Sequence, residues 1–162
     1  MSIINESQEE QLVVFTVGSN EFGISIYVVR EIINETKVVK LPKMPSFMVG
    51  VLNLRENVIP VVDLAERLGM ESEVGDKDSR KILIVELEGN LVGYLVTGVT
   101  EVLRVPSEAL EQPSSALSGM GNGVIQYICK LEDRLFPVLG TDNMFETNEL
   151  DKIEDVITNK IG

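Results

Sequence analysis

Few residues of this chain could carry out chemistry. No histidine occurs among the 162 residues, which excludes Ser-His-Asp and Cys-His catalysis and imidazole metal sites. The carboxylates of Asp63, Glu66 and Asp142 are the remaining candidates for acid and base, and they would make the chain a carboxylate-dependent hydrolase. The spacing of Asp63 and Glu66 is also that of a helix capping box, which explains both residues without catalysis. Cys129 has apolar neighbours and is expected to pack within a strand rather than act as a nucleophile.

Composition and charge restrict the possible partners. The formal net charge of -12 would repel nucleic acid and an anionic membrane surface. No glycine-rich phosphate loop is present, so no cofactor is expected. The single cysteine cannot form an internal disulfide and suits a reducing compartment. No apolar run approaches the roughly 20 residues of a membrane helix, and the N-terminal residues lack a signal-peptide pattern. We expect a cytoplasmic chain without direct membrane insertion.

The elements that would position these residues are mostly strands. The hydrophobic content of 44% is dominated by Val, Ile and Leu, which favours strands. Alternating patterns and turn residues predict strands over residues 12–17, 22–26, 36–41, 47–54, 58–62, 81–87, 91–96, 99–105, 124–131 and 135–139. Residues 27–33 are predicted to form a short turn that leads into a strand, and residues 64–68 a short helix begun by Asp63. Residues 70–80 and 106–122 are predicted loops.

Two parts of the chain resemble each other. Residues 17–24 match residues 87–94, and residues 52–61 match residues 129–138, with a shared apolar-Pro-Val step in the second pair. Hairpins share generic patterns, so chance similarity is the alternative explanation. A repeat of about five short strands predicts two small β-barrels that share a core, since neither half could bury much apolar surface alone.

The repeat suggests a domain organisation. We expect a flexible N-terminal segment over residues 1–11 and a folded domain over residues 12–145. This domain would divide into one lobe over residues 12–79 and another over residues 80–145. Residues 146–162 are predicted to form an amphipathic helix, because Leu150, Ile153, Ile157 and Ile161 recur at helical spacing.

One segment carries a more specific pattern. Two prolines precede Gly-Val-Leu-Asn-Leu-Arg at residues 50–55, and Val-Ile-Pro-Val-Val-Asp-Leu follows at residues 58–64. This segment resembles the CheW-like domain family of bacterial chemotaxis, and the resemblance extends over roughly residues 11–145. It implies a mainly β fold of two SH3-like five-stranded barrels with a hydrophobic core between them. It also implies a non-enzymatic adaptor that couples the cytoplasmic tips of methyl-accepting chemoreceptors to the regulatory domain of the histidine kinase CheA. Such an adaptor would be cytoplasmic and associated with membrane-bound receptor arrays.

The chain departs from the family pattern at several positions, which include Glu56, Gly140 and the loosely matched residues 120–126. The family usually has glycine after the arginine of Asn-Leu-Arg, whereas this chain has Glu56. A glycine at this position indicates a positive φ, which a glutamate resists. The geometry of the turn at Arg55, Glu56 and Asn57 is therefore an open question for the structure.

The resemblance also implies two binding surfaces. The receptor-binding groove would consist of Val13, Ile26, Val29, Ile32, Arg55 and Val99. The kinase-binding surface would contain Glu31, Val38 and Lys40. As residue types, the apolar members are equally ordinary core residues, and Arg55 is an ordinary hairpin-tip charge. Because Val29 and Val99 are equivalent in the repeat, they could instead face each other in the core between the lobes.

Two other functions remain open from the sequence. One is the carboxylate-dependent hydrolase, against which stands the lack of a nucleophile–base pair. The other is the receptor-coupling part of a longer adaptor that carries a phosphorylatable receiver domain.

Overall fold

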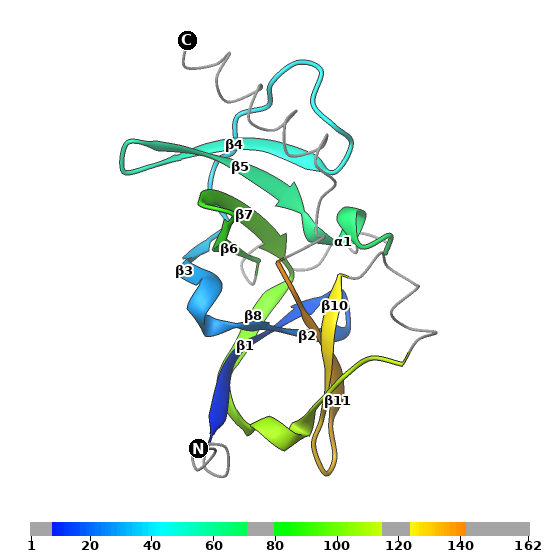
Figure 1. Cartoon of the computed structure of the whole chain (residues 1–162). Coiled ribbons are helices and arrows are strands. Elements are labelled where there is room, and N and C mark those ends of the chain that lie inside the picture. The colour runs from blue at the N-terminus through cyan, green and yellow to red at the C-terminus, as the bar shows by residue number, and fades with distance from the viewer. Residues whose placement is uncertain (1–7, 71–79, 115–123, 142–162) are drawn as a thin grey trace.

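The computed structural model describes residues 8–70, 80–114 and 124–141 (Figure 1). The fold is mainly β and consists of two sheets, here named sheet A and sheet B. Sheet A has the order β8–β1–β2–β11–β10–β9, with β1 Glu9–Val17, β2 Asn20–Ser25, β8 Gly98–Pro106, β9 Leu110–Glu111, β10 Ile125–Lys130 and β11 Leu135–Leu139. Sheet B has the order β3–β6–β7–β5–β4, with β3 Val29–Asn34, β4 Met48–Leu54, β5 Asn57–Asp63, β6 Lys81–Leu87 and β7 Asn90–Val96.

In the described part of the chain, three short helices connect the strands. The 3-10 turn η2, Ile26–Val28, carries the chain from sheet A to sheet B (Figure 1). Helix α1, Leu64–Arg67, follows β5, and a second 3-10 turn, η4 Ser107–Ala109, follows β8. The predicted turn-to-strand step over residues 27–33 is thus confirmed. Part of the expected loop over residues 106–122 is instead η4 and β9.

The strand pairing confirms the internal repeat. Strands β1 to β5 correspond in order to β6, β7, β8, β10 and β11, and the two sheets share one pairing scheme. The parallel pairs agree in detail, because Val138 lies beside Gly23 in sheet A and Val61 lies beside Gly93 in sheet B. Pairs of residues that match in sequence therefore occupy matching places in the fold.

The division into two consecutive lobes at residues 79 and 80 is wrong. Sheet A combines the first hairpin, β1–β2, with β8 to β11, and sheet B combines the second hairpin, β6–β7, with β3 to β5. Each half of the chain thus gives its first hairpin to one sheet and its later strands to the other. A pattern of apolar residues along the chain predicts strands but does not specify which distant strands pair, so the exchange was not foreseen.

The described residues form three apolar clusters, one of which joins the two sheets. The largest cluster lies between the sheets and contains residues of both, among them Phe15 of β1 and Leu83 of β6. A second cluster belongs to sheet A and includes Cys129 and Phe136, and a third belongs to sheet B and includes Ile84. The first cluster confirms the prediction of a shared core, which lies here between two sheets.

Two further expectations differ from the structure. Strand β1 begins at Glu9, so the last residues of the expected flexible segment are already paired. Residues 36–41 do not form the expected strand. Only Val39 pairs, with Val51 of β4, at a point where β4 is bulged between Met48 and Gly50. The predicted C-terminal helix over residues 146–162 lies outside the described residues.

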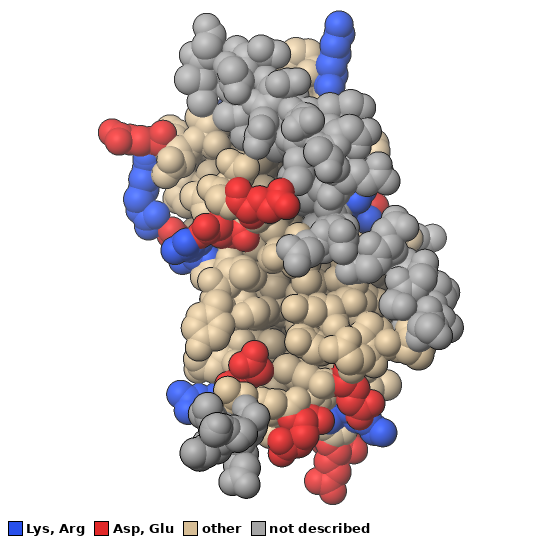
Figure 2. All heavy atoms as spheres, viewed as in Figure 1, with Lys and Arg blue, Asp and Glu red and all other residues tan. Residues whose placement is uncertain are grey.

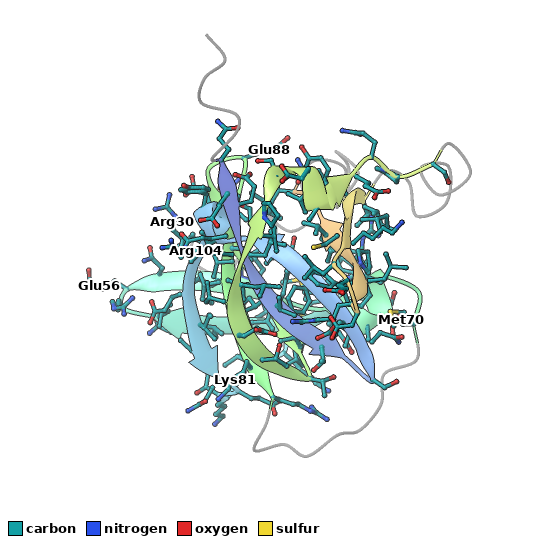
Figure 3. All side chains as sticks on the ribbon, turned by 90° about the horizontal axis from the view of Figure 1, so that it is seen from below. Arg30, Glu56, Met70, Lys81, Glu88 and Arg104 are labelled. Carbon is teal, nitrogen blue, oxygen red and sulfur yellow. The ribbon has the colours of Figure 1, made fainter. Side chains whose placement is uncertain are left out.

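The turn between β4 and β5 has the positive φ that the family's glycine at the position of Glu56 indicates. Leu54 pairs with Asn57, which leaves Arg55 and Glu56 as a two-residue turn. Their φ angles are 53° and 82°, so both residues are left-handed, as in a type I′ hairpin turn. Glu56 lies at the far tip of this hairpin and points away from the body of the protein (Figure 3).

Glu56→Gly is expected to raise the free energy of unfolding by about 1 kcal/mol, because glycine adopts a positive φ without steric cost. Urea unfolding measures the difference. Gly89 is the natural comparison, since it occupies the second turn position of the β6–β7 hairpin with a φ of 85°. Gly89→Glu should destabilise the chain by a similar amount, and a stabilising effect of that change would contradict the argument.

Candidate docking surface

Strand β3 forms one edge of sheet B and exposes apolar side chains beside the shared core. Val29 lies opposite Val85, and Ile32 lies opposite Leu83. Val85 and Leu83 belong to the cluster between the sheets, and cross-strand partners project from the same face of a sheet. Val29 and Ile32 therefore extend this core to the protein surface.

Strand β8 forms the corresponding edge of sheet A. Val99 lies opposite Phe15, and Val102 lies opposite Val13. Both partners again belong to the cluster between the sheets. Val99 and Val102 are the repeat equivalents of Val29 and Ile32, so related positions of the two edge strands flank the same core.

These side chains, together with η2, make up a surface that we name the apolar rim. Its members are Ile26, Tyr27, Val29, Ile32, Val99 and Val102. The exposed fractions are 81% for Tyr27, 51% for Val102 and 39% for Ile32, which are high for large apolar residues. Figure 2 shows a band without charged side chains across the middle of the molecule, at the level of η2 in Figure 1. An exposed apolar surface of this kind is typical of a docking site.

The structure distinguishes among the predicted groove residues. Ile26, Val29 and Val99 are half-buried and pack against the shared core, so each contributes both to this core and to the surface of the rim. Val13 does not line an open groove, because it is only 1% exposed. Its strand has sheet neighbours on both sides and an apolar cluster on each face, as the unbroken apolar run at residues 12–15 could have indicated.

Tyr27 and Val102 were absent from the predicted groove. Val102 could have been found from the repeat, because it is the equivalent of Ile32. Nothing in the residue pattern marked Tyr27, whose exposure depends on the 3-10 turn that Ser25 begins by accepting a hydrogen bond from the Tyr27 backbone N–H.

An ion pair joins the two predicted surfaces. Arg55, expected on the receptor side, donates from Nη1 and Nη2 to the two carboxylate oxygens of Glu31, expected on the kinase side, at 2.7 and 3.0 Å. Strand β3 and the β4–β5 hairpin lie at opposite ends of the strand order of sheet B, so the pair spans a strongly curved sheet. The hydrogen bonds between Arg55 and Glu31 lower the pKa of the Glu31 carboxyl and raise the pKa of the Arg55 guanidinium.

Arg55→Gln should raise the pKa of the Glu31 carboxyl towards its ordinary value, because the hydrogen bonds to the guanidinium are lost. A carbon NMR titration of the glutamate side chains measures this change. Since the folded-state pKa of Glu31 is depressed, the pair stabilises the fold above the ordinary glutamate pKa, and this contribution disappears as the pH falls through the folded-state value. An unchanged Glu31 titration in the variant would contradict the ion pair.

The other two residues of the predicted kinase surface lie elsewhere on sheet B. Val38 is half-buried against the third apolar cluster, and Lys40 is exposed. Both flank Val39, which pairs with β4, at the opposite edge of the sheet from β3. The structure thus brings Val38 and Lys40 together and separates them in the strand order from Glu31.

Of the candidate catalytic residues, Asp63 has a structural role. Asp63 accepts hydrogen bonds from the backbone N–H groups of Ala65 and Glu66 and so caps helix α1, while Asp142 lies outside the described residues. Cys129 is buried in sheet A, and burial raises the pKa of its thiol. Within the described ranges, no three acidic or cysteine side chains gather in a way that could hold a metal ion. No helix in the described part of the chain is long and apolar enough to cross a membrane.

Comparison with known proteins agrees with this architecture. Residues 11–149 match the CheW-like domain family. The chain is 32% identical over 142 residues to a probable chemotaxis protein CheW of Rhizobium etli, and the match covers 87% of this chain and 90% of the relative. It is 31% identical over 140 residues to a chemotaxis protein CheW of Rhizobium meliloti, and this match covers 86% of this chain and 89% of the relative. The crystal structure of the scaffolding protein TtCheW from Thermoanaerobacter tengcongensis superimposes with a TM-score of 0.80 at 30% identity, covering 88% of this chain and 96% of that one. The chain therefore belongs to the CheW-like domain family, as a non-enzymatic scaffold of chemotaxis.

Proposed function

We propose that this scaffold holds a chemoreceptor and a histidine kinase together. The cytoplasmic tip of a methyl-accepting chemoreceptor docks on the apolar rim, and the regulatory domain of the kinase CheA docks on the part of sheet B that presents Val38 and Lys40. The protein acts in the cytoplasm, beside membrane-bound receptor arrays. Binding both partners at once raises the effective concentration of each for the other, so that modest individual affinities suffice.

The observation that carries this proposal is the apolar rim. Its side chains come from the 3-10 turn η2 and from two edge strands related by the repeat, whose apolar residues continue the shared core outwards. An amphipathic helix buries its apolar stripe in a surface of this kind, which suits a helical receptor tip. The kinase contact is supported by the edge of β4, where Val39 makes an isolated pairing and leaves its neighbours Val38 and Lys40 beside the sheet edge.

Backbone NMR titrations with a receptor-tip fragment and, separately, with the kinase regulatory domain test the proposal. The receptor fragment should shift signals of the rim, and the kinase domain should shift those around Val38 and Lys40. Val102→Asp should weaken binding of the receptor fragment at least about tenfold, because a charge would be buried against the helix, and should leave kinase binding unchanged.

Leu135→Asp is the matched control, because Leu135 is another exposed apolar residue, 68% exposed, outside the rim. It should not alter the affinity for the receptor fragment. Equal effects of Val102→Asp and Leu135→Asp on receptor binding would reject the rim as the docking site. Failure of the unmodified chain to bind either partner would reject the coupling function.

A further inference from the structure

Strand β8 is bulged at the point where it contributes to the apolar rim. Its pairing with β1 skips Thr100, which forms a bulge between Val99 and Glu101. A bulge interrupts the hydrogen-bonded ladder locally and changes the direction of the neighbouring side chains. Strand β8 also lies at the edge of sheet A, so that among the described strands only β1 pairs with it. The orientation of Val99 and Val102 therefore depends on what else holds β8 at the bulge.

A second connection to β8 comes from Arg134, which immediately precedes β11. Its Nη1 lies 2.9 Å from a carboxylate oxygen of Glu101, and its Nη2 donates to Glu21 of β2 at 2.9 Å. The guanidinium carbon lies 5.5 Å from the centre of the Phe136 ring, and the arginine side chain is only 26% exposed. Two carboxylates and an aromatic face thus fix the guanidinium, which ties the bulge of β8 to β2 and to the β10–β11 hairpin.

Arg134 holds β8 from the face opposite the apolar rim. Glu101 pairs with Val14, whose side chain belongs to the cluster within sheet A. Val102 pairs with Val13, whose side chain belongs to the cluster between the sheets. Since cross-strand partners project from the same face of a sheet, the side chains of Glu101 and Val102 lie on opposite faces of β8. A partner docked on the rim would not contact Arg134, so any effect of Arg134 on docking must pass through β8.

Sheet B makes the same kind of connection by a different route. Strand β3 is bulged at the equivalent point, and Glu31, the repeat equivalent of Glu101, is paired with Arg55. The repeat equivalent of Arg134 is Asn57, so the two arginines occupy different positions of their hairpins. Both copies therefore fasten the glutamate beside the bulge, although their shared sequence pattern does not require it. The connection in sheet A is the better shielded from water, because the Arg55 side chain is 71% exposed.

We propose that Arg134 is a positioning residue for docking on the apolar rim. By holding Glu101, it keeps the bulge of β8 in one geometry and so keeps Val99 and Val102 directed at the partner. This inference rests on the proposed function and adds to it a residue that acts without touching the partner. A guanidinium suits this role, because its planar fork holds two carboxylates at once in fixed directions. Partial shielding from water makes such contacts stronger than those of a fully exposed ion pair.

Arg134→Gln should weaken binding of the receptor-tip fragment about fivefold in calorimetry, because only part of the molecules would then present the rim in the binding geometry. Lys130→Gln is the control, since Lys130 is an exposed residue of β10 outside the rim and its loss changes the net charge equally. This variant should bind the receptor fragment as the unmodified chain does. The affinity for the kinase regulatory domain should be the same in both variants, which a general loss of structure in Arg134→Gln would not allow.

Glu101→Gln provides a second measurement and should weaken receptor binding to the same extent. Because Arg134 acts through Glu101, the double variant should bind no more weakly than Arg134→Gln alone. In the free protein, the amide hydrogens that join β8 to β1 beside the bulge should exchange faster in Arg134→Gln than in Lys130→Gln.

Equal receptor affinities of Arg134→Gln and Lys130→Gln, or additive losses in the double variant, would overturn the positioning role and leave the coupling function intact. If the unmodified chain binds no receptor fragment, the coupling function fails. The amide exchange then decides the role of Arg134 by itself, and equal exchange rates in Arg134→Gln and Lys130→Gln would overturn it.

Discussion

Gly50→Ala is expected to lower the free energy of unfolding by about 2 kcal/mol or more, or to detach the segment around Val39 from β4. A Cβ atom at Gly50 would lie 2.4 Å from the Val39 carbonyl oxygen and 2.7 Å from a Val38 methyl group. Both distances are far shorter than van der Waals contact, so the backbone must move or the strand must distort. Urea unfolding measures the loss of stability.

The detachment has its own readout. Val39 and Val51 exchange two backbone hydrogen bonds of 2.8 Å, and their amide hydrogens should exchange faster in the variant. Gly69→Ala provides the control, because Gly69 has a φ of 74° but open space around the position of a Cβ atom. It should cost about 1 kcal/mol, from backbone strain alone. A Gly50→Ala variant as stable as Gly69→Ala would show that the approach of Val39 to Gly50 is not tight.

Phe15→Ala is expected to destabilise the whole chain by about 3–5 kcal/mol. Phe15 is fully buried in the cluster between the sheets and stacks on Phe22, with ring centres 6.0 Å apart. Because strands of both sheets contribute to this cluster, the loss should affect sheet A and sheet B together. Chemical unfolding followed by amide signals in both sheets should therefore show a single transition, shifted to lower denaturant concentration.

The exposed aromatic residue Tyr27 is the control for Phe15. Tyr27→Ala should change the stability by less than about 0.5 kcal/mol, since most of the side chain is already in water. Two separate transitions in Phe15→Ala, with sheet B unaffected, would mean that the cores of the two sheets are independent and that the shared cluster does not couple them.

Local patterns predicted most of the elements. The hairpins, the cap at Asp63 and the repeat all depend on neighbouring residues, and the structure confirms them. The pairing of β1 with β8 and of β2 with β11 depends on residues far apart in the chain, and no periodicity specifies such partners. The consecutive lobes expected from the repeat were wrong for this reason, although the repeat itself was correct.

The candidate site residues show the same difference between local patterns and pairings of distant residues. The equivalence of Val29 and Val99 was predictable from the repeat, and the two residues lie at matching positions of the edge strands β3 and β8. The pairing of Arg55 with Glu31 could not be predicted, since it requires the curvature of sheet B to bring β3 towards the tip of the β4–β5 hairpin. The burial of Val13 follows from the sheet neighbours on both sides of β1 and the apolar clusters on both its faces, which are known only once the sheets are assembled.

The exchange of strands between the halves has a consequence for biosynthesis. When β1 and β2 leave the ribosome they form only a bare hairpin, because their lateral partners β8 and β11 are translated near the end of the described chain. Sheet A is thus completed only after β11 has been made, and sheet B must wait for β6 and β7. Pairings between such distant segments fold slowly, in milliseconds to seconds. We expect sheet A of a nascent chain stalled before β8 to remain sensitive to protease.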